Sequence, residues 1–219
     1  MVGCEYIMNI PVGISNRHVH LTEEVWKKLF GDEEITVRNY LNQPGQFASN
    51  MTVDIKVGDA IINHIRVVGP FRNYNQIEID DTDAKILGVI PPRRQSGDLN
   101  GSLPITVIGP KGSVFLDKGL IMSDAHIHMD PETATKMHLV NKEVVDVFKN
   151  GVKLLNVKIK ILDNSYIEMH IDKDEEVLYD LHQGDIVEFK KSNKTVSNYY
   201  KNTYDAHQEG SSYFLDKRQ

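Results

Sequence analysis

The chain has 219 residues, 40% of them hydrophobic, and a formal net charge of −6. This composition supports a packed core and excludes wholesale disorder, and the negative charge argues against a protein that binds nucleic acid through its overall field. A single cysteine excludes an internal disulfide framework. Because no segment has the roughly 20 apolar residues of a membrane span, and the N-terminus lacks the pattern of a secretory signal, we expect no membrane partner and a cytoplasmic location.

The first distinctive stretch is SNRHVHL, residues 15–21, which contains a His-x-His pair. Residues two apart on a strand point to the same face, so His18 and His20 project two imidazoles in one direction. A short helix is predicted directly afterwards over 22–31, with Thr22 as its N-cap and Gly31 as its stop.

The middle and later parts of the chain consist of short segments rich in Val and Ile, several of which alternate apolar and polar residues. Examples are MTVDIKV, IINHIRVVG, NQIEID, LPITVIGPKGSVFL and DIVEFKK. Asn150-Gly151 lies between two further such runs and predicts a type I′ hairpin. Many short strands with these turn signals favour a mainly β protein, built as barrels or sandwiches, over a doubly wound sheet.

A second His-x-His pair, His126 and His128, occurs in DAHIHMD and again precedes a predicted short helix, with Asp130 as its cap and Pro131 in its first turn. The two stretches GISNRHVHLTEEV and GLIMSDAHIHMDPETA therefore form an internal repeat, and VVGPFR and VIGPKG form a weaker second echo. Two similar halves that face each other would give a pseudo-symmetric site. Four imidazoles in two repeated pairs favour a metal, for which imidazole suits Zn²⁺.

Two further strands carry polar residues in alternation. Glu168, His170 and Asp172 are expected on one face of a strand, where His170 would be a metal ligand between carboxylates; Glu78 and Asp80 are expected to share a face in the same way. A solvated strand edge would give the same pattern in both places, so the alternation alone leaves this open.

Basic residues in two places suit a phosphate group. Arg66 and Arg72 flank a Gly-Pro turn, and Arg93 and Arg94 precede a Ser-Gly-Asp turn, although a solvated loop is the commoner explanation of the second stretch. The common nucleotide-binding glycine loops and the nucleophile elbow of serine hydrolases are missing from the sequence. Direct chemistry at a metal is therefore the preferred class.

Several blocks together resemble a known family, the PduL-type phosphotransacylases, also called phosphate propanoyltransferases. They are VGISNRHVHL, QPGQFA, VVGPFR, PRRQSGDL, GPKG, AHIHM and EMHIDKDE, in that order from about residue 10 to about residue 190. The resemblance implies two tandem small β-barrels with short capping helices and an active site between them. The implied domains are 17–123 for the first barrel, 1–16 with 124–191 for the second, and 192–219 as a polar C-terminal tail.

The resemblance also implies a site. Two zinc ions would be held by six side chains, and Co²⁺, Mn²⁺ or Fe²⁺ could also be accepted by these ligands. The metal ligands would be His18, His20, Glu78, His126, His128 and His170. Arg72 would be the catalytic residue that holds phosphate, and Ser15 and Arg66 would contact coenzyme A.

The activity implied is the interconversion of acyl-CoA and phosphate with acyl phosphate and CoA, the acyl group being acetyl or propanoyl, in a homodimer. Only about nine residues precede Ile10, so microcompartment targeting is not expected. Similar proteins carry an asparagine where this chain has Val177, so one CoA contact of the family lacks its amide here. Two alternatives remain: a metal-dependent acyl-CoA thioesterase or phosphoesterase, and a non-catalytic binding module with structural zinc.

Overall fold

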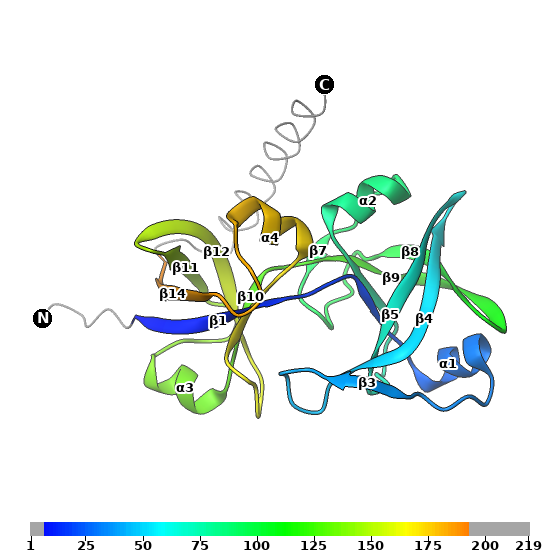
Figure 1. Cartoon of the computed structure of the whole chain (residues 1–219), viewed down its shortest axis with the longest axis horizontal. Coiled ribbons are helices and arrows are strands. Elements are labelled where there is room, and N and C mark those ends of the chain that lie inside the picture. The colour runs from blue at the N-terminus through cyan, green and yellow to red at the C-terminus, as the bar shows by residue number, and fades with distance from the viewer. Residues whose placement is uncertain (1–6, 193–219) are drawn as a thin grey trace, which may run out of the picture. The chain divides into compact units, whose positions relative to one another are not determined.

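The computed structural model describes residues 7–192, and the predicted tail lies almost wholly outside them. The protein is mainly β, with fourteen strands and four short helices in the described part of the chain (Figure 1). Contacts divide the described residues into two units. One contains residues 7–12, His126–Met169 and 184–192, and the other contains Gly13–Ala125 and His170–Gln183. The predicted domain boundaries stay a prediction.

The first barrel is a closed ring of six strands in the order β9-β6-β2-β5-β4-β8, in which β8 pairs with both β4 and β9. Two short strands, β3 and β7, extend the sheet beyond the ring. The strands are β2 (His18–His20), β3 (Val37–Tyr40), β4 (Phe47–Val57), β5 (Ala60–Gly69), β6 (Gln76–Ile79), β7 (Arg93–Arg94), β8 (Leu103–Gly109) and β9 (Gly112–Ser123). Ring closure leaves the six barrel strands without an open edge.

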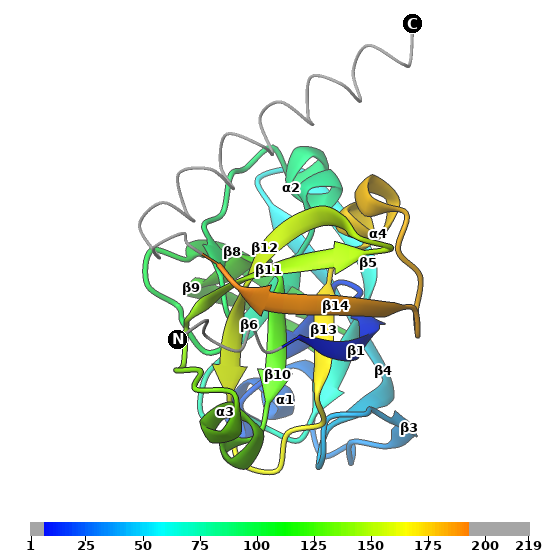
Figure 2. The same ribbon diagram turned by 90° about the vertical axis from the view of Figure 1, so that its left-hand side faces the viewer.

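The second barrel is a closed ring in the order β1-β13-β10-β12-β11-β14, which can be followed in Figure 2. Its strands are β1 (Met8–Ile14), β10 (His126–Met129), β11 (Val144–Lys149), β12 (Val152–Ile161), β13 (Glu168–Ile171) and β14 (Ile186–Lys191). The predicted hairpin is confirmed between β11 and β12, where Asn150 and Gly151 have φ of 53° and 76°. Both central residues of a type I′ turn need such positive φ values.

The two rings have the same pairing pattern. The His-x-His strand of each ring pairs parallel to one neighbour, β2 with β5 and β10 with β12. Its other neighbour is β6 in the first ring and β13 in the second. The predicted repeat is therefore a repeat of structure. The weaker echo is wrong, because Gly69 ends β5 whereas Gly109-Pro110 belongs to the β8–β9 turn, and β5 and β8 occupy different positions in the ring.

Helix α1 (Glu23–Phe30) begins and ends as predicted, since the Thr22 hydroxyl accepts from the Val25 N–H and Gly31 has φ of 67°. Val25, Trp26, Leu29 and Phe30 form its buried stripe, and the Trp26 and Phe30 rings stack with centroids 4.1 Å apart. The helix packs on β8 and β9 of the first barrel. Its burial fixes the chain that follows the first His-x-His strand.

The other helices also begin at a capping side chain. Asp130 caps α3 (Pro131–Lys136), with Pro131 in its first turn as predicted. Asp80 caps α2 (Asp81–Leu87) and Asp172 caps α4 (Lys173–Tyr179), the latter through a capping box with Glu175. Among the described residues, no helix has the length and apolar character needed to cross a membrane.

Candidate metal centres and anion site

The first barrel brings three predicted ligands together. His18 and His20 lie on β2, and Glu78 lies on β6, directly opposite His18 in the antiparallel register. Their ligand atoms are all within 4.8 Å of one another, and His18 Nε2 is 3.5 Å from Glu78 Oε1. His20 and Glu78 are buried. The three residues form what we call the β2–β6 triad.

Backbone carbonyls orient both imidazoles of this triad. His18 Nδ1 is 2.8 Å from the Asn16 carbonyl oxygen, and His20 Nδ1 is 3.1 Å from that of Val68. A carbonyl oxygen can only accept, so each Nδ1 carries the proton and donates it. In the neutral form of each ring this leaves the Nε2 lone pair for a metal, which is the usual arrangement for a metal-binding histidine.

The electrostatic setting favours neutral His20. Burial, and then the neighbouring His18, lower the pKa of His20 to about 3, so its ring is neutral and able to bind a metal at physiological pH. Burial also opposes a charge on His18, but the Glu78 carboxylate outweighs it and raises the His18 pKa. A metal cation bound between His18 and Glu78 would balance the Glu78 charge in place of a proton on His18.

Two side chains hold the Glu78 carboxylate. The Gln76 amide donates to Oε1 at 2.6 Å, and the Ser123 hydroxyl donates to Oε2 at 2.9 Å. Gln76 also donates to the Ser96 hydroxyl and accepts from the Gly97 N–H, so it joins the loop after β7 to Glu78. Sequence reasoning missed Gln76 and Ser123; the Gln-x-Glu alternation on β6 was a usable signal for the first.

The second barrel brings together the other three predicted ligands, which we call the β10–β13 triad. His126 and His128 lie on β10 and His170 on its neighbour β13, with their ligand atoms within 4.8 Å of one another. His126 and His128 are buried, and their Nε2 atoms are 3.0 Å apart. Nitrogens this close suit a shared cation.

The two triads are equivalent in the chain as well as in the ring. Glu78 and His170 are each the third residue of a four-residue strand, and each is followed two positions later by an aspartate that caps a helix. Asp80 and Asp172 are therefore helix caps, and the expectation that they extend the strand faces of Glu78 and His170 is wrong. The sequence signal for the caps was Asp-x-x-Asp and Asp-x-x-Glu.

Both triads fit a divalent metal. Three imidazoles, or two imidazoles and one carboxylate, form the donor sets of open zinc sites, and they also accept Co²⁺, Mn²⁺ and Fe²⁺. In the β2–β6 triad the geometry also supports metal binding, because the Nδ1 hydrogen bonds of His18 and His20 leave Nε2 available to a metal. The structure thus contains two candidate metal centres.

Arg72 lies next to the β2–β6 triad. Its backbone N–H donates to the Leu21 carbonyl at 2.9 Å, which ties it to the end of the His-x-His segment. Its charge opposes protonation of both His18 and His20, although Glu78 outweighs it at His18, and its Nε is buried with no hydrogen-bond partner in the described part of the chain. A buried, unpaired guanidinium N–H is costly, and an anion bound beside the triad would satisfy it.

The two predicted coenzyme A contacts occupy different settings. Arg66 lies on β5 opposite His18, and its Nη1 donates to the carbonyls of Ser49 and Asn50 at 3.1 and 2.9 Å. Burial, and then the charge of Arg38, lower the Arg66 pKa. The Ser15 N–H donates to the Ile171 carbonyl at 2.8 Å. The rest of the Arg66 guanidinium could serve a phosphate.

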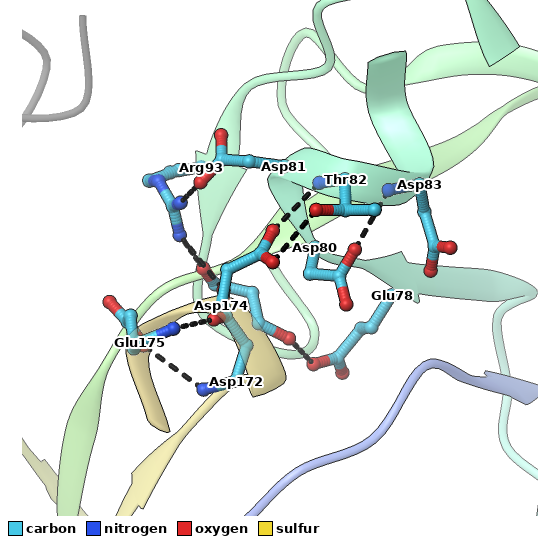
Figure 3. Close-up of polar contacts among 10 residues, drawn as sticks. Glu78, Asp80, Asp81, Thr82, Asp83, Arg93, Asp172, Asp174 and Glu175 are labelled. Atoms are coloured by element: carbon cyan, nitrogen blue, oxygen red, sulfur yellow. Dashed lines mark hydrogen bonds and ion pairs between the residues drawn. The ribbon is translucent and has the colours of Figure 1, made fainter. Parts of the chain in front are cut away.

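Arg93 forms ion pairs with carboxylates, whereas the sequence suggested that it could bind phosphate. Its guanidinium pairs with Asp81 (Figure 3) and Asp172, and it donates to the Ser123 carbonyl at 2.6 Å. Arg94 donates to backbone carbonyls of Asn100 and Arg93. Arg93 thus belongs to a buried ion-pair network that sequence reasoning missed, because its carboxylates come from distant parts of the chain.

The barrels and the two triads define a double-barrel protein with two candidate metal centres. Residues 11–182 match the family model for phosphate propanoyltransferase. The phosphate propanoyltransferase of Rhodopseudomonas palustris is 40% identical over 83% of this chain and 82% of its own length, and that of Thermotoga maritima is 43% identical over 81% and 87%. The chain belongs to the phosphate propanoyltransferase family and is an acyltransferase.

Among solved structures, a computationally designed protein, msDPBB_sym2, matches 31% of this chain at 17% identity with a TM-score of 0.25, which carries no argument about the fold. The family implies CoA or acyl-CoA and phosphate as substrates.

Proposed function

We propose that the protein is a zinc-dependent phosphotransacylase that transfers an acetyl or propanoyl group directly between CoA and phosphate. The observation that carries the proposal is the buried Nε of Arg72 beside the β2–β6 triad, which has no hydrogen-bond partner among residues 7–192. A donor held in that position is suited to a phosphate oxygen, since guanidinium forms charge-assisted bonds to phosphate.

The two triads would hold one zinc ion each, through His18, His20 and Glu78 and through His126, His128 and His170. Bound zinc would polarise the thioester carbonyl and neutralise charge that develops on oxygen. We further propose that the two ions act as one dinuclear centre and that the enzyme is a homodimer. X-ray absorption of the zinc-loaded protein tests the first point through a metal–metal scattering path, and light scattering tests the second.

In the proposed reaction, Arg72 binds phosphate and orients one of its oxygens toward the thioester carbonyl carbon. A bond forms between that oxygen and the carbon, the carbon–sulfur bond breaks, and CoA leaves as a thiolate that takes a proton from solvent. Arg66 and Ser15 would bind the CoA moiety, Arg66 through a phosphate of the nucleotide. No side chain is acylated. Recovery of a covalent acyl-enzyme from the native protein would contradict direct transfer.

The test of the proposal is thiol release from acetyl-CoA and propanoyl-CoA by metal-quantified protein, with and without inorganic phosphate. Release should require phosphate and yield an acyl phosphate that hydroxylamine traps. Arg72→Ala should lower kcat/KM for phosphate by about 100-fold or more, the range for removal of a charge-stabilising donor. Arg72→Lys keeps the charge but loses the planar guanidinium, so its kcat/KM for phosphate should lie between the values of Arg72→Ala and the native protein.

Release that ignores phosphate would instead identify a thioesterase. No release from either donor, by protein that holds its full metal content, would identify a binding module with structural metal.

A further inference from the structure

One buried guanidinium, that of Arg93, connects three segments of the chain. Its side chain is 11% exposed, and it reaches the end of β9, the first residue of α2 and the residue that caps α4. The contacts are the Ser123 carbonyl at 2.6 Å, the Asp81 carboxylate, and the Asp172 carboxylate at 3.5 Å (Figure 3).

Each of these segments leads to the third ligand of a triad. At the end of β9, Ser123 accepts from Arg93 through its carbonyl and donates its hydroxyl to Glu78 Oε2. Asp81 begins the helix that follows Glu78, and Asp172 caps the helix that follows His170. The guanidinium therefore acts on Glu78 from two sides and on the strand end that carries His170.

A second contact joins the same two helices. The Asp174 carboxylate accepts from the Thr82 backbone N–H at 2.7 Å and from the Thr82 hydroxyl at 2.8 Å. A residue of α4 thereby satisfies an N–H in the first turn of α2, where intrahelical partners are lacking. Arg93 and this contact together hold the starts of α2 and α4 next to each other (Figure 3).

The carboxylates around Arg93 favour an arginine over a lysine at this position. Burial opposes a charge on this guanidinium, but the carboxylates of Glu175, Asp81, Asp172 and Asp124 outweigh burial and raise its pKa. A lysine would carry the same charge, but one ammonium group cannot reproduce a planar fork directed at three segments. Loss of the guanidinium would remove the positive charge that Arg93 supplies to these buried carboxylates.

We infer that Arg93 is a positioning residue for both third ligands, Glu78 and His170, and so sets the metal affinity of both triads. This inference rests on the proposed metal-dependent function. Mutation of residues that hydrogen-bond to metal ligands and orient them typically changes metal affinity 10–100-fold.

The test is a titration of the metal-free full chain with Co²⁺, followed by visible absorption and by calorimetry. The native protein should bind two equivalents. Arg93→Lys should weaken both equivalents by about 10–100-fold. Ser123→Ala, which removes the hydroxyl bond to Glu78 alone, should weaken one equivalent and leave the other unchanged. Arg94→Lys, the neighbouring arginine on β7, is the matched control and should bind like the native protein.

Arg93→Lys that binds two equivalents with native affinity and spectrum would overturn the inference. If Arg93→Lys does not fold, Asp81→Asn removes one partner of Arg93 and should weaken the equivalent at Glu78; native binding by that variant would also overturn it. A native protein that binds no Co²⁺ and no Zn²⁺ would contradict the proposed metal dependence itself, which distinguishes the two failures.

Discussion

At the scale of single residues, the protein places several ionisable side chains in buried positions where other groups compensate for their burial. Glu78, His20 and Asp172 are each less than 6% exposed, and each has partners directed at it. The candidate ligands were predicted from sequence, the four histidines of the His-x-His pairs from their alternation on strands and Glu78 from the family resemblance. The groups that support these ligands could not be predicted, because Ser123 and Arg93 are separated from the ligands in sequence and approach them only in the folded chain.

Glu175 allows a test of this burial through the pH dependence of stability. Burial, and then the Asp172 carboxylate, raise its pKa well above the ordinary value, and Arg93 only partly offsets this. A raised carboxyl pKa in the folded state stabilises the fold at low pH, and this contribution is lost as the pH rises through the folded-state pKa.

Glu175→Gln keeps an acceptor for the Asp172 N–H without the charge, so its free energy of unfolding relative to the native protein should increase from pH 5 to pH 8. Urea unfolding at both pH values measures this. Glu176→Gln, which removes a carboxylate that pairs with Lys173 on the same helix, is the control. An equal effect of Glu175→Gln at both pH values would contradict the prediction.

At the scale of elements, the caps, turns and longer strands that carry a local sequence signal were predicted. Thr22, Asp130 and the Asn150-Gly151 turn each carry a local signal, and the structure confirms all three. The two-residue strand β7 carries no such signal, because it is a strand only through its pairing with β9.

Gly69 gives an element-scale prediction at the turn that leads to Arg72. A Cβ added there would lie 2.3 Å from the Phe47 ring, so Gly69→Ala should displace β4 or β5 and destabilise the fold by roughly 1–3 kcal/mol. Thermal unfolding measures the loss. Phe47→Leu makes room for the added methyl, and the double variant should recover part of the stability; no recovery would show that the cost has another origin.

At the scale of the whole molecule, a mainly β protein with two small β-barrels was predicted. The strand-pairing pattern that the two rings share was visible in the sequence only as a repeated His-x-His strand followed by a helix. The sequences of the remaining strands differ too much to align by eye; β6 reads QIEI and its counterpart β13 reads EMHI. The equal position of Glu78 and His170 emerges only from the ring order.

Metal removal should affect the molecule as a whole. If both triads bind zinc only in the folded chain, ligand linkage stabilises it by about 4 kcal/mol for each site at a free metal concentration of 1,000 times Kd. Dialysis against a chelator should therefore lower the thermal midpoint, and two equivalents of zinc should restore it. His20→Ala and His128→Ala should each halve the restored metal content, and a midpoint unchanged by chelation would contradict the prediction.

The position of β1 has a consequence for how the protein is made. β9 closes the first ring as its last strand, whereas β1 occupies the equivalent place in the second ring but precedes all the other strands of the described residues, so it is synthesised before them. Its register partner for Met8 is Phe189. During synthesis the first barrel has all its strands by Ser123, while β1 waits with open backbone groups until β13 and β14 arrive. Closure of the second barrel is therefore the late, slow step of folding, and the nascent chain is most exposed to aggregation before it.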